Sequence, residues 1–327
     1  MHAIRQYEFG PAENLRYEEV PDLAPGAGQV RVAVAAAGVH LVDTSIRQGQ
    51  TGGPFPLPAL PMTPGREVAG VVDAVGAEVS AEWIGKRVVA HLGQASGGYA
   101  EQALAAAASL HELPAGVSAQ AAVAAIGTGR TAMGILETAQ LTADDVVVIT
   151  AAAGGLGALL VQAARNVGAI VAGVAGGVTK VALVRELGAD IAVDYTAPDW
   201  AEQVRTALAG RAATVALDGV GGESGRAALE LLGSGGRLVL FGFSAGAPVE
   251  LSAGDLFRFG ISATAAVGAR LLQRPGGLRE LEIRALTEVA SGRLTPLVNP
   301  PFSLKDAATA HTALTTRATV GKVVLTP

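Results

Sequence analysis

The stretch ITAAAGGLGALLVQAARNVGA, residues 149–169, decides the fold of the second half of the chain. The apolar run VVVIT (146–150) predicts a strand, which leads into a turn of small residues and then into a helix predicted over 156–167. Apolar residues recur along this helix at helical spacing, and Gly168 ends the pattern. A strand, a small-residue turn and a helix in this order are typical of the first unit of a doubly wound sheet.

The rest of this half repeats the alternation of strand and helix. Further strands are predicted at 170–174, 190–193, 214–218, 237–241 and 261–267, with helices near 178–187, 200–208 and 223–232. Six strands with helices between them predict an α/β protein with a Rossmann-type, doubly wound parallel sheet.

The first 120 residues have a different character. Short alternating or apolar segments punctuated by Gly and Pro predict strands at 29–39, 67–79 and 86–92, one short helix at 41–48 and a proline-rich loop at 54–65. This part is therefore expected to be β-rich, without the rhythm of a parallel sheet. The last 50 residues add two helical patterns and a closing strand, GKVVLTP.

Composition excludes several classes of protein. The chain has 327 residues, enough for two domains, and a net charge of −5 with no basic run, which argues against nucleic-acid binding. It has no cysteine, so disulfides and cysteine zinc sites are excluded. The N-terminus lacks the pattern of a signal peptide, and no apolar run reaches membrane-spanning length. We expect a soluble cytoplasmic protein.

The turn after the first strand is the candidate dinucleotide site. The usual fingerprint is Gly-x-Gly-x-x-Gly; here Ala152 takes the first position, and Gly154 and Gly157 hold the other two. Backbone N–H groups at the start of the helix would bind the pyrophosphate, favoured by the helix dipole. The predicted binding residues of this turn are Ala153, Gly154, Gly155, Leu156 and Gly157. The alternative is a tight turn without a ligand.

The end of the second strand indicates which dinucleotide binds. NAD sites usually have Asp or Glu there to accept from the ribose hydroxyl, but VAGGVTK (174–180) has no acid. A carboxylate would repel a 2′-phosphate, so its absence, with Lys180 nearby, favours NADP(H). The alternative for Lys180 is a solvated side chain at the start of a helix.

These residues and several other motifs resemble one family. The chain is similar over essentially its whole length to zinc-free medium-chain dehydrogenases/reductases of the quinone oxidoreductase (zeta-crystallin-like) family. The motifs are GVHLVDTSIRQG (38–49), PGREVAGVVDAVG (64–76), GKRVVAH (85–91), AAAGGLG (151–157), GADIAVDY (188–195), DGVGG (218–222), FGFSAG (241–246) and RATVGKVVL (317–325).

The resemblance implies a domain organisation and a cofactor. A GroES-like catalytic domain would comprise residues 1–120 and 268–327, and a Rossmann domain residues 121–267, with NADPH between them. Three residues would hold the 2′-phosphate, namely Lys180, Tyr195 and Arg317, with Gly176 lining the same place. Further contacts implied by the motifs are Gly242 and Phe243 near the nicotinamide, Thr128 near its ribose or the phosphates, and Val220.

The chemistry follows from the lack of metal ligands. Relatives with zinc use Cys and His, whereas this chain has no cysteine and Arg66-Glu67 replaces the zinc His-Glu pair. The five histidines show no ligand spacing, so no metal site is expected. Without a Lewis acid, alcohol oxidation is difficult, whereas hydride transfer to a polarised acceptor needs less help. The predicted activity is therefore NADPH-dependent reduction of a quinone or an α,β-unsaturated carbonyl.

Two residues are the candidates for catalysis. His40 and Ser45 stand where many relatives have Asn and Tyr facing the substrate. His40 would donate to the oxygen on which negative charge develops, unless it only hydrogen-bonds the cofactor ribose. Ser45 would be a weak donor, or a small residue that enlarges the pocket. An enoyl thioester reductase and an NADPH sensor or structural protein without turnover remain alternatives.

The last predicted strand of the sheet bears on assembly. Strand 261–267 is expected at the edge of the sheet, where an unpaired apolar strand would be covered by a partner. We expect a homodimer through this strand, as the resemblance also implies.

Overall fold

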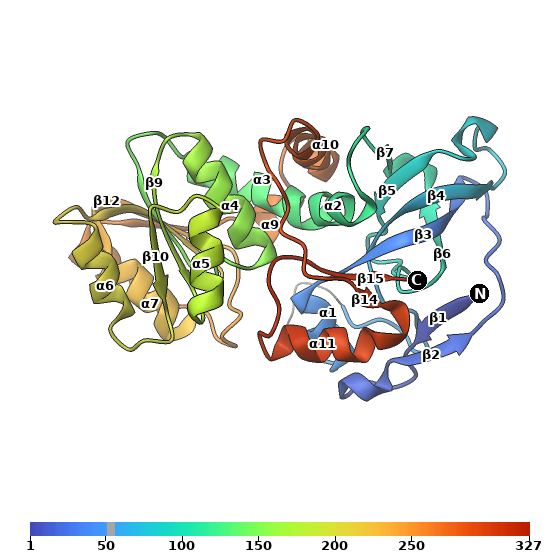
Figure 1. The fold of residues 1–327 in the computed structure, drawn as a ribbon, viewed down its shortest axis with the longest axis horizontal. Helices are drawn as coiled ribbons and strands as arrows, with labels where there is room; N and C mark the ends of the chain where they lie inside the picture. Colours follow the sequence, from blue (N-terminus) through green and yellow to red (C-terminus); the bar gives the residue numbers. More distant parts are fainter. Residues whose placement is uncertain (51–55) are drawn as a thin grey trace. The chain divides into compact units, whose positions relative to one another are not determined.

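The computed structural model describes residues 1–50 and 56–327 (Figure 1). Residues 54 and 55 of the predicted proline-rich loop lie outside the described residues. The chain forms two compact units: the first comprises residues 1–128, 285–290 and 296–327, and the second 129–284 and 291–295. The functional domain limits near 120 and 267 stay a prediction.

The first unit is built on a seven-stranded sheet in the order β14-β15-β3-β4-β5-β7, with β6 also paired to β3. Its strands are β3 (Gln29–Val39), β4 (Glu67–Val75), β5 (Arg87–His91), β6 (Gln102–Ala106), β7 (Leu110–Glu112), β14 (Phe302–Ser303) and β15 (Val323–Thr326). Strand β3 lies between β15 and β4 and has the predicted limits; Val30, Val32 and Val34 are buried as its alternation requires. Strands from both chain ends therefore meet at β3.

Smaller elements complete the first unit. A two-stranded sheet joins β1 (His2–Arg5) and β2 (Arg16–Glu19). The helices are α1 (Leu41–Arg47), α2 (Ala119–Val123) and α11 (Ala307–Thr315), with short turns at η1 (Ala12–Asn14), η2 (Ala81–Trp83), η3 (Ala107–Ser109), η5 (Leu304–Asp306) and a π-helical segment, η4 (Ala124–Gly129). The segment η4 ends at the boundary between the two units.

The second unit is the predicted doubly wound sheet, which confirms the fold class. Its six parallel strands follow the order β10-β9-β8-β11-β12-β13. They are β8 (Val146–Ile149), β9 (Ile170–Ala175), β10 (Ile191–Asp194), β11 (Ala213–Asp218), β12 (Leu232–Leu240) and β13 (Ser262–Ala265). Strand β8 is fully buried, as the continuous apolar run VVVI predicts for a central parallel strand.

Helices connect these strands and flank the sheet (Figure 1). The connecting helices are α4 (Gly155–Asn166), α5 (Val178–Glu186), α6 (Trp200–Ala207), α7 (Gly222–Glu230) and α8 (Ala253–Phe259). Helix α3 (Arg130–Ala139) precedes β8, and α9 (Ala269–Leu272) and α10 (Gly277–Ala290) follow β13; the last six residues of α10 belong to the first unit. The strand order reverses between β8 and β11. In such sheets ligands bind at the carboxyl ends of the strands at this switch point, so the fold draws attention to the turns that follow β8 and β11.

Candidate functional site

The turn between β8 and α4 holds the start of the helix against the sheet. Ala151 adopts a left-handed conformation (φ +48°), and its carbonyl accepts from the N–H of Gly154 at 2.9 Å. A Cβ on Gly157 would overlap the Ala151 carbonyl oxygen and lie 2.7 Å from the Ala152 Cα, so this position needs glycine. The first three N–H groups of α4, those of Gly155, Leu156 and Gly157, have no carbonyl within the helix to bond. They are suited to an anion.

The alanine in the fingerprint has a structural explanation. Ala152 is completely buried, and its N–H donates to the Val174 carbonyl of β9 at 2.9 Å. A Cβ on Gly173 of β9 would lie 3.1 Å from the Ala152 Cβ and 2.5 Å from Val184 Cγ1. The methyl group at position 152 is accommodated because the neighbouring strand has glycine opposite it. Ala153 is also buried within this turn.

The turn between β9 and α5 brings Gly176 and Tyr195 together. A Cβ on Gly176 would lie 3.1 Å from the Tyr195 hydroxyl oxygen, so the phenol rests over bare backbone. Lys180 is the third residue of α5, which begins two residues after Gly176. An acid that the sequence analysis passed over, Asp194, lies beside them. Its Oδ1 accepts from the N–H of Gly177 and from Thr196, and these hydrogen bonds lower the pKa of Asp194.

The third turn follows β11 and is tied to β8 through a buried carboxylate. Asp218 is fully buried and accepts from the Thr150 hydroxyl (2.7 Å) and from the N–H groups of Val220 and Gly221 (both 3.0 Å). Thr150 Oγ1 in turn accepts from the N–H of Gly219 at 3.0 Å. This network joins the carboxyl ends of the two strands at the switch point.

The loop after β12 is bonded to the same turn. The N–H of Ser244 donates to the Gly219 carbonyl (3.1 Å) and that of Ala245 to the Val220 carbonyl (2.9 Å). A Cβ on Gly242 would lie 3.0 Å from the Gly219 oxygen, and the Phe243 ring is 53% exposed. Val220, Gly242 and Phe243, predicted separately, therefore lie in two adjoining loops.

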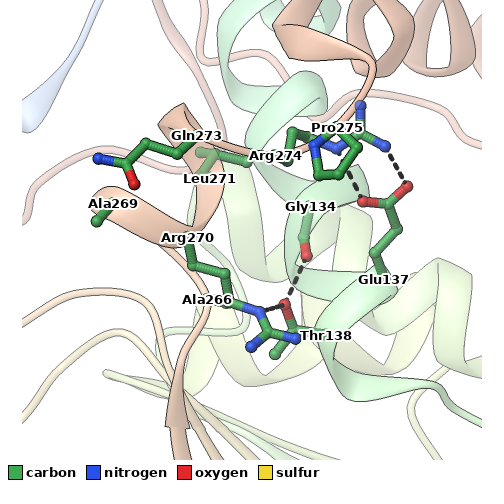
Figure 2. A pocket seen from close by; sticks show the side chains of 10 residues that line it. All are labelled: Gly134, Glu137, Thr138, Ala266, Ala269, Arg270, Leu271, Gln273, Arg274 and Pro275. Atoms are coloured by element: carbon green, nitrogen blue, oxygen red, sulfur yellow. Dashed lines mark hydrogen bonds and ion pairs between the residues drawn. The ribbon is translucent and has the colours of Figure 1, made fainter.

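A cavity of about 490 Å³ lies between α3 and the segment that follows β13 (Figure 2). Ala266, which lines it, donates its N–H to the Leu240 carbonyl at the end of β12 (2.8 Å). Arg274 pairs with Glu137 (Nη2–Oε1, 2.9 Å), and Arg270 Nε donates to Thr138 Oγ1 at 3.2 Å. The cavity therefore combines arginine side chains with apolar lining such as Leu271.

In the first unit His40 belongs to a compact cluster of charged side chains. It caps α1, and its Nε2 contacts Glu67 Oε1 of β4 by a short hydrogen bond. Lys322, just before β15, places Nζ 2.8 Å from Glu67 Oε2 and 3.0 Å from His40 Nε2. Glu67 is fully buried and the Lys322 side chain is 4% exposed, whereas the His40 side chain is 23% exposed. His40 is thus the member of the cluster within reach of solvent.

Two glycines make room for the Glu67 carboxylate. A Cβ on Gly38 would overlap Glu67 Oε2 and lie 2.9 Å from Lys322 Cε, and a Cβ on Gly127 would overlap Glu67 Oε1. Burial alone would raise the pKa of Glu67, but the charges of His40 and Lys322 outweigh it and hold that pKa well below its ordinary range. Glu67 is therefore an anion at neutral pH.

A second polar chain lies behind this cluster. The His40 backbone N–H donates to Asp43 Oδ2 (2.8 Å), which also accepts from the Tyr99 hydroxyl (3.3 Å). The Tyr99 oxygen lies 3.1 Å from His311 Nε2 of α11. Burial raises the pKa of Tyr99 and lowers the pKa of His311 to about 4, so both are neutral at pH 7.

The remaining predicted residues occupy the first unit. Thr128 is buried in η4, and Arg317 follows α11 with a left-handed backbone (φ +59°). Ser45 is half-buried in the middle of α1. The structure thus groups the predicted residues by unit: the three turns lie in the second unit, and His40, Ser45, Thr128 and Arg317 in the first.

Comparison with known proteins assigns the chain to a family. The alcohol dehydrogenase GroES-like domain model matches residues 26–115, and the zinc-binding dehydrogenase model matches residues 155–281. A quinone oxidoreductase of Pseudomonas aeruginosa is 32% identical over 321 residues, which cover 98% of this chain and 97% of that protein. The chain belongs to the quinone oxidoreductase family of medium-chain dehydrogenases/reductases.

Two further relatives show how far this similarity extends. A 2-haloacrylate reductase from a Burkholderia species is 31% identical over 334 residues, covering 100% of this chain and 99% of that enzyme. The structure of Escherichia coli quinone oxidoreductase complexed with NADPH is 30% identical, covers both chains completely and superposes with a TM-score of 0.88. The resemblance noted in the sequence is confirmed.

Sequence reasoning missed the buried partners of the site. Glu67, Lys322 and Asp218 were not proposed as site residues, although each is a charge within or beside an apolar strand. That pattern is a usable signal, because a buried charge requires a partner. Among residues 1–50 and 56–327, no three His, Asp or Glu side chains gather as metal ligands, and no helix is long and apolar enough to cross a membrane.

Proposed function

We propose that this member of the quinone oxidoreductase family transfers a hydride from NADPH to a small quinone or α,β-unsaturated carbonyl. The observation that carries the cofactor proposal is the pairing of Gly176 with Tyr195 beside the start of α5. Where NAD sites hold a carboxylate for the ribose hydroxyls, this chain offers a phenol and the Lys180 ammonium, which suit a phosphate. The relative from E. coli was solved with NADPH.

Each part of the second unit would hold one part of the cofactor. The free N–H groups of Gly155, Leu156 and Gly157 would bind the pyrophosphate, and Lys180 with Tyr195 the 2′-phosphate. The loop at Gly242 and Phe243 would lie near the nicotinamide. The contacts that the resemblance implies for Arg317 with the 2′-phosphate, and for Thr128 with the ribose or the phosphates, stay predictions.

Two side chains of this protein take part in the proposed reaction. NADPH, when bound, supplies the hydride. His40 would donate a proton to the oxygen of the acceptor, since it is the partly exposed member of its cluster. Ser45 would be a second, weaker donor.

The test begins with the cofactor. We expect fluorescence titration to show tighter binding of NADPH than of NADH, and Lys180→Ala to weaken NADPH binding by about 10- to 100-fold because it removes a charged contact to phosphate. Binding of NADH should change little. Lys305→Ala, which removes one exposed charge in η5 of the other unit, is the matched control and should leave both affinities unchanged.

The acceptor is tested next with 1,4-benzoquinone, 9,10-phenanthrenequinone, a 2-alkenal and an enoyl thioester, following loss of the NADPH absorbance. Turnover of one of these compounds would identify the acceptor class as a quinone, an enal or an enoyl thioester. A preference for NADH would contradict the assignment at Gly176 and Lys180. Tight NADPH binding with no turnover of any acceptor would instead favour an NADPH sensor.

A further inference from the structure

Asp194 brings a negative charge to the turn where the 2′-phosphate of NADPH would bind. It ends β10, and in the register of the sheet it lies beside Ala175, the last residue of β9. Its Oδ1 accepts from the N–H of Gly177 at 2.9 Å, so the carboxylate lies one residue from Gly176, over which the Tyr195 phenol rests. A group bound against that phenol would be within about 10 Å of this charge, near enough that salt does not screen it fully.

The two oxygens of this carboxylate differ in their surroundings. Oδ1 also accepts from the backbone N–H and the hydroxyl of Thr196, at 2.9 and 2.7 Å. No group in residues 1–50 and 56–327 donates to Oδ2, and the residue is only half-buried. The hydrogen bonds to Oδ1, led by that from Gly177, lower the pKa of Asp194, so it is an anion at neutral pH. The turn therefore holds a fixed negative charge with one acceptor oxygen open.

We infer that Asp194 is a specificity-determining residue that limits the preference of this site for NADPH over NADH. The inference rests on the proposed function, because it concerns the same cofactor site. A carboxylate repels a 2′-phosphate, whereas its open oxygen can accept from the 2′-hydroxyl that NADH has in the same place. Lys180 and Tyr195 act in the opposite direction, since an ammonium and a phenol favour the phosphate. The preference for one cofactor reflects the balance of these groups.

The strand that carries the acid explains why it restrains NADPH binding without abolishing it. NAD sites have their carboxylate at the end of the second strand, which here is β9 and ends at Ala175, followed by Gly176. Asp194 stands at the end of the next strand of the sheet, β10, and neighbouring strands are about 5 Å apart. The greater separation weakens the repulsion, because the energy between two charges falls with distance.

The experiment compares the dissociation constants of NADPH and NADH, by fluorescence titration, in the wild type and in Asp194→Asn. The amide keeps an oxygen for Gly177 and Thr196, and it replaces the charged Oδ2 with an N–H donor. We expect Asp194→Asn to bind NADPH about 3- to 10-fold more tightly and NADH about 2- to 5-fold more weakly. A role in holding the turn alone would weaken the binding of both cofactors.

Asp190→Asn is the matched control. Asp190 lies just before β10, at the opposite end of the strand, and its Oδ2 accepts from the N–H of Val171 on β9 at 2.8 Å. This substitution also removes a carboxylate that is bonded to the backbone of the neighbouring segment, and it should leave both affinities unchanged. Asp194→Ser is the second test variant: it removes the charge, and its hydroxyl can still accept a hydrogen bond, so it decides the question if Asp194→Asn does not fold.

The outcomes separate this inference from the proposed function. An unchanged or reduced preference for NADPH in the Asp194 variants would overturn the inference, even if the wild type prefers NADPH and reduces a quinone. An increased preference without turnover of any acceptor would count against the proposed function alone. A wild-type preference for NADH that shifts toward NADPH in the variants would contradict the proposed cofactor and support the role of Asp194. A wild type that binds neither cofactor would overturn both.

Discussion

At the scale of single residues, the site requires glycine at positions where a side chain would collide with its neighbours. Gly38 and Gly127 leave the space that the Glu67 carboxylate fills, and Gly157 lets α4 begin directly on the preceding turn. Glycine in such positions is a packing requirement, because any side chain would collide with backbone or with a buried charged group. Substitutions there test the site without changing a functional group.

Gly127→Ala is expected to push the Glu67 carboxylate away from His40. Its Cβ would overlap Glu67 Oε1 and lie 2.8 Å from Glu67 Cδ. Overpacking of this kind lowers the free energy of unfolding by about 1–3 kcal/mol. Urea denaturation would measure the loss. Gly254→Ala is the matched control, since the nearest atom to its Cβ is 3.4 Å away and alanine suits a helix; equal losses in both variants would refute the argument.

The candidate site was predictable to the extent that its residues are neighbours in sequence. The turn at Gly154 and Gly157 is a local pattern, and its geometry follows from backbone rules. The partners of His40 come from β4 and from the segment before β15, 27 and 282 residues away along the chain. Their encounter depends on strand register, which a single sequence does not reveal.

At the scale of elements, the sequence predicted the six strand segments of the second unit, because strands of a parallel sheet covered on both faces appear as apolar runs. It placed the start of β12 at Arg237, whereas the strand begins at Leu232, within LGSGG. Glycine and serine interrupt the apolar pattern in this part of the strand, so the sequence does not predict it. The pairing with β11 also shifts register there. Helix α8 was missed because it is short, contains Gly254 and leaves Phe257 89% exposed.

The edge strand β13 carries the prediction about assembly. It pairs with β12 alone within its sheet, and Ser262 and Ala265, which lie on opposite faces of the strand, are exposed. If two copies join through this strand, lysines at both positions would bring like charges together across the interface. We expect sedimentation equilibrium to show a wild-type dimer and a monomeric Ser262→Lys/Ala265→Lys variant with an unchanged circular dichroism spectrum. A wild-type monomer at micromolar concentration would contradict the prediction.

At the scale of the whole molecule, a buried histidine should make stability depend on pH. Burial lowers the pKa of His311 from its ordinary value of 6.5 to about 4. Between these values the unfolded chain binds a proton that the folded chain does not, so the free energy of unfolding falls as the pH falls through this window. The gap corresponds to a loss of about 3 kcal/mol.

His311→Gln removes the titrating group while keeping a polar side chain opposite Tyr99. The variant should lose most of the slope between pH 6.5 and 4 in urea denaturation midpoints. The depressed pKa of Glu67 acts in a different window, because its contribution is present above its ordinary value of 4.5 and is lost as the pH falls below it. An identical slope in wild type and His311→Gln would show that other groups control the dependence.

The alanine at position 152 has a consequence for how such chains are recognised. Its methyl group is tolerated because Gly173, on the adjacent strand, gives up its own side chain. The space between positions 152 and 173, which are 21 residues apart in the sequence, therefore accommodates one methyl group. Either position can carry that methyl group, provided that the other is glycine. A search that scores the glycine string alone rejects this chain. We expect positions 152 and 173 to covary among relatives, and a pairwise pattern to recover cofactor sites that the linear motif misses.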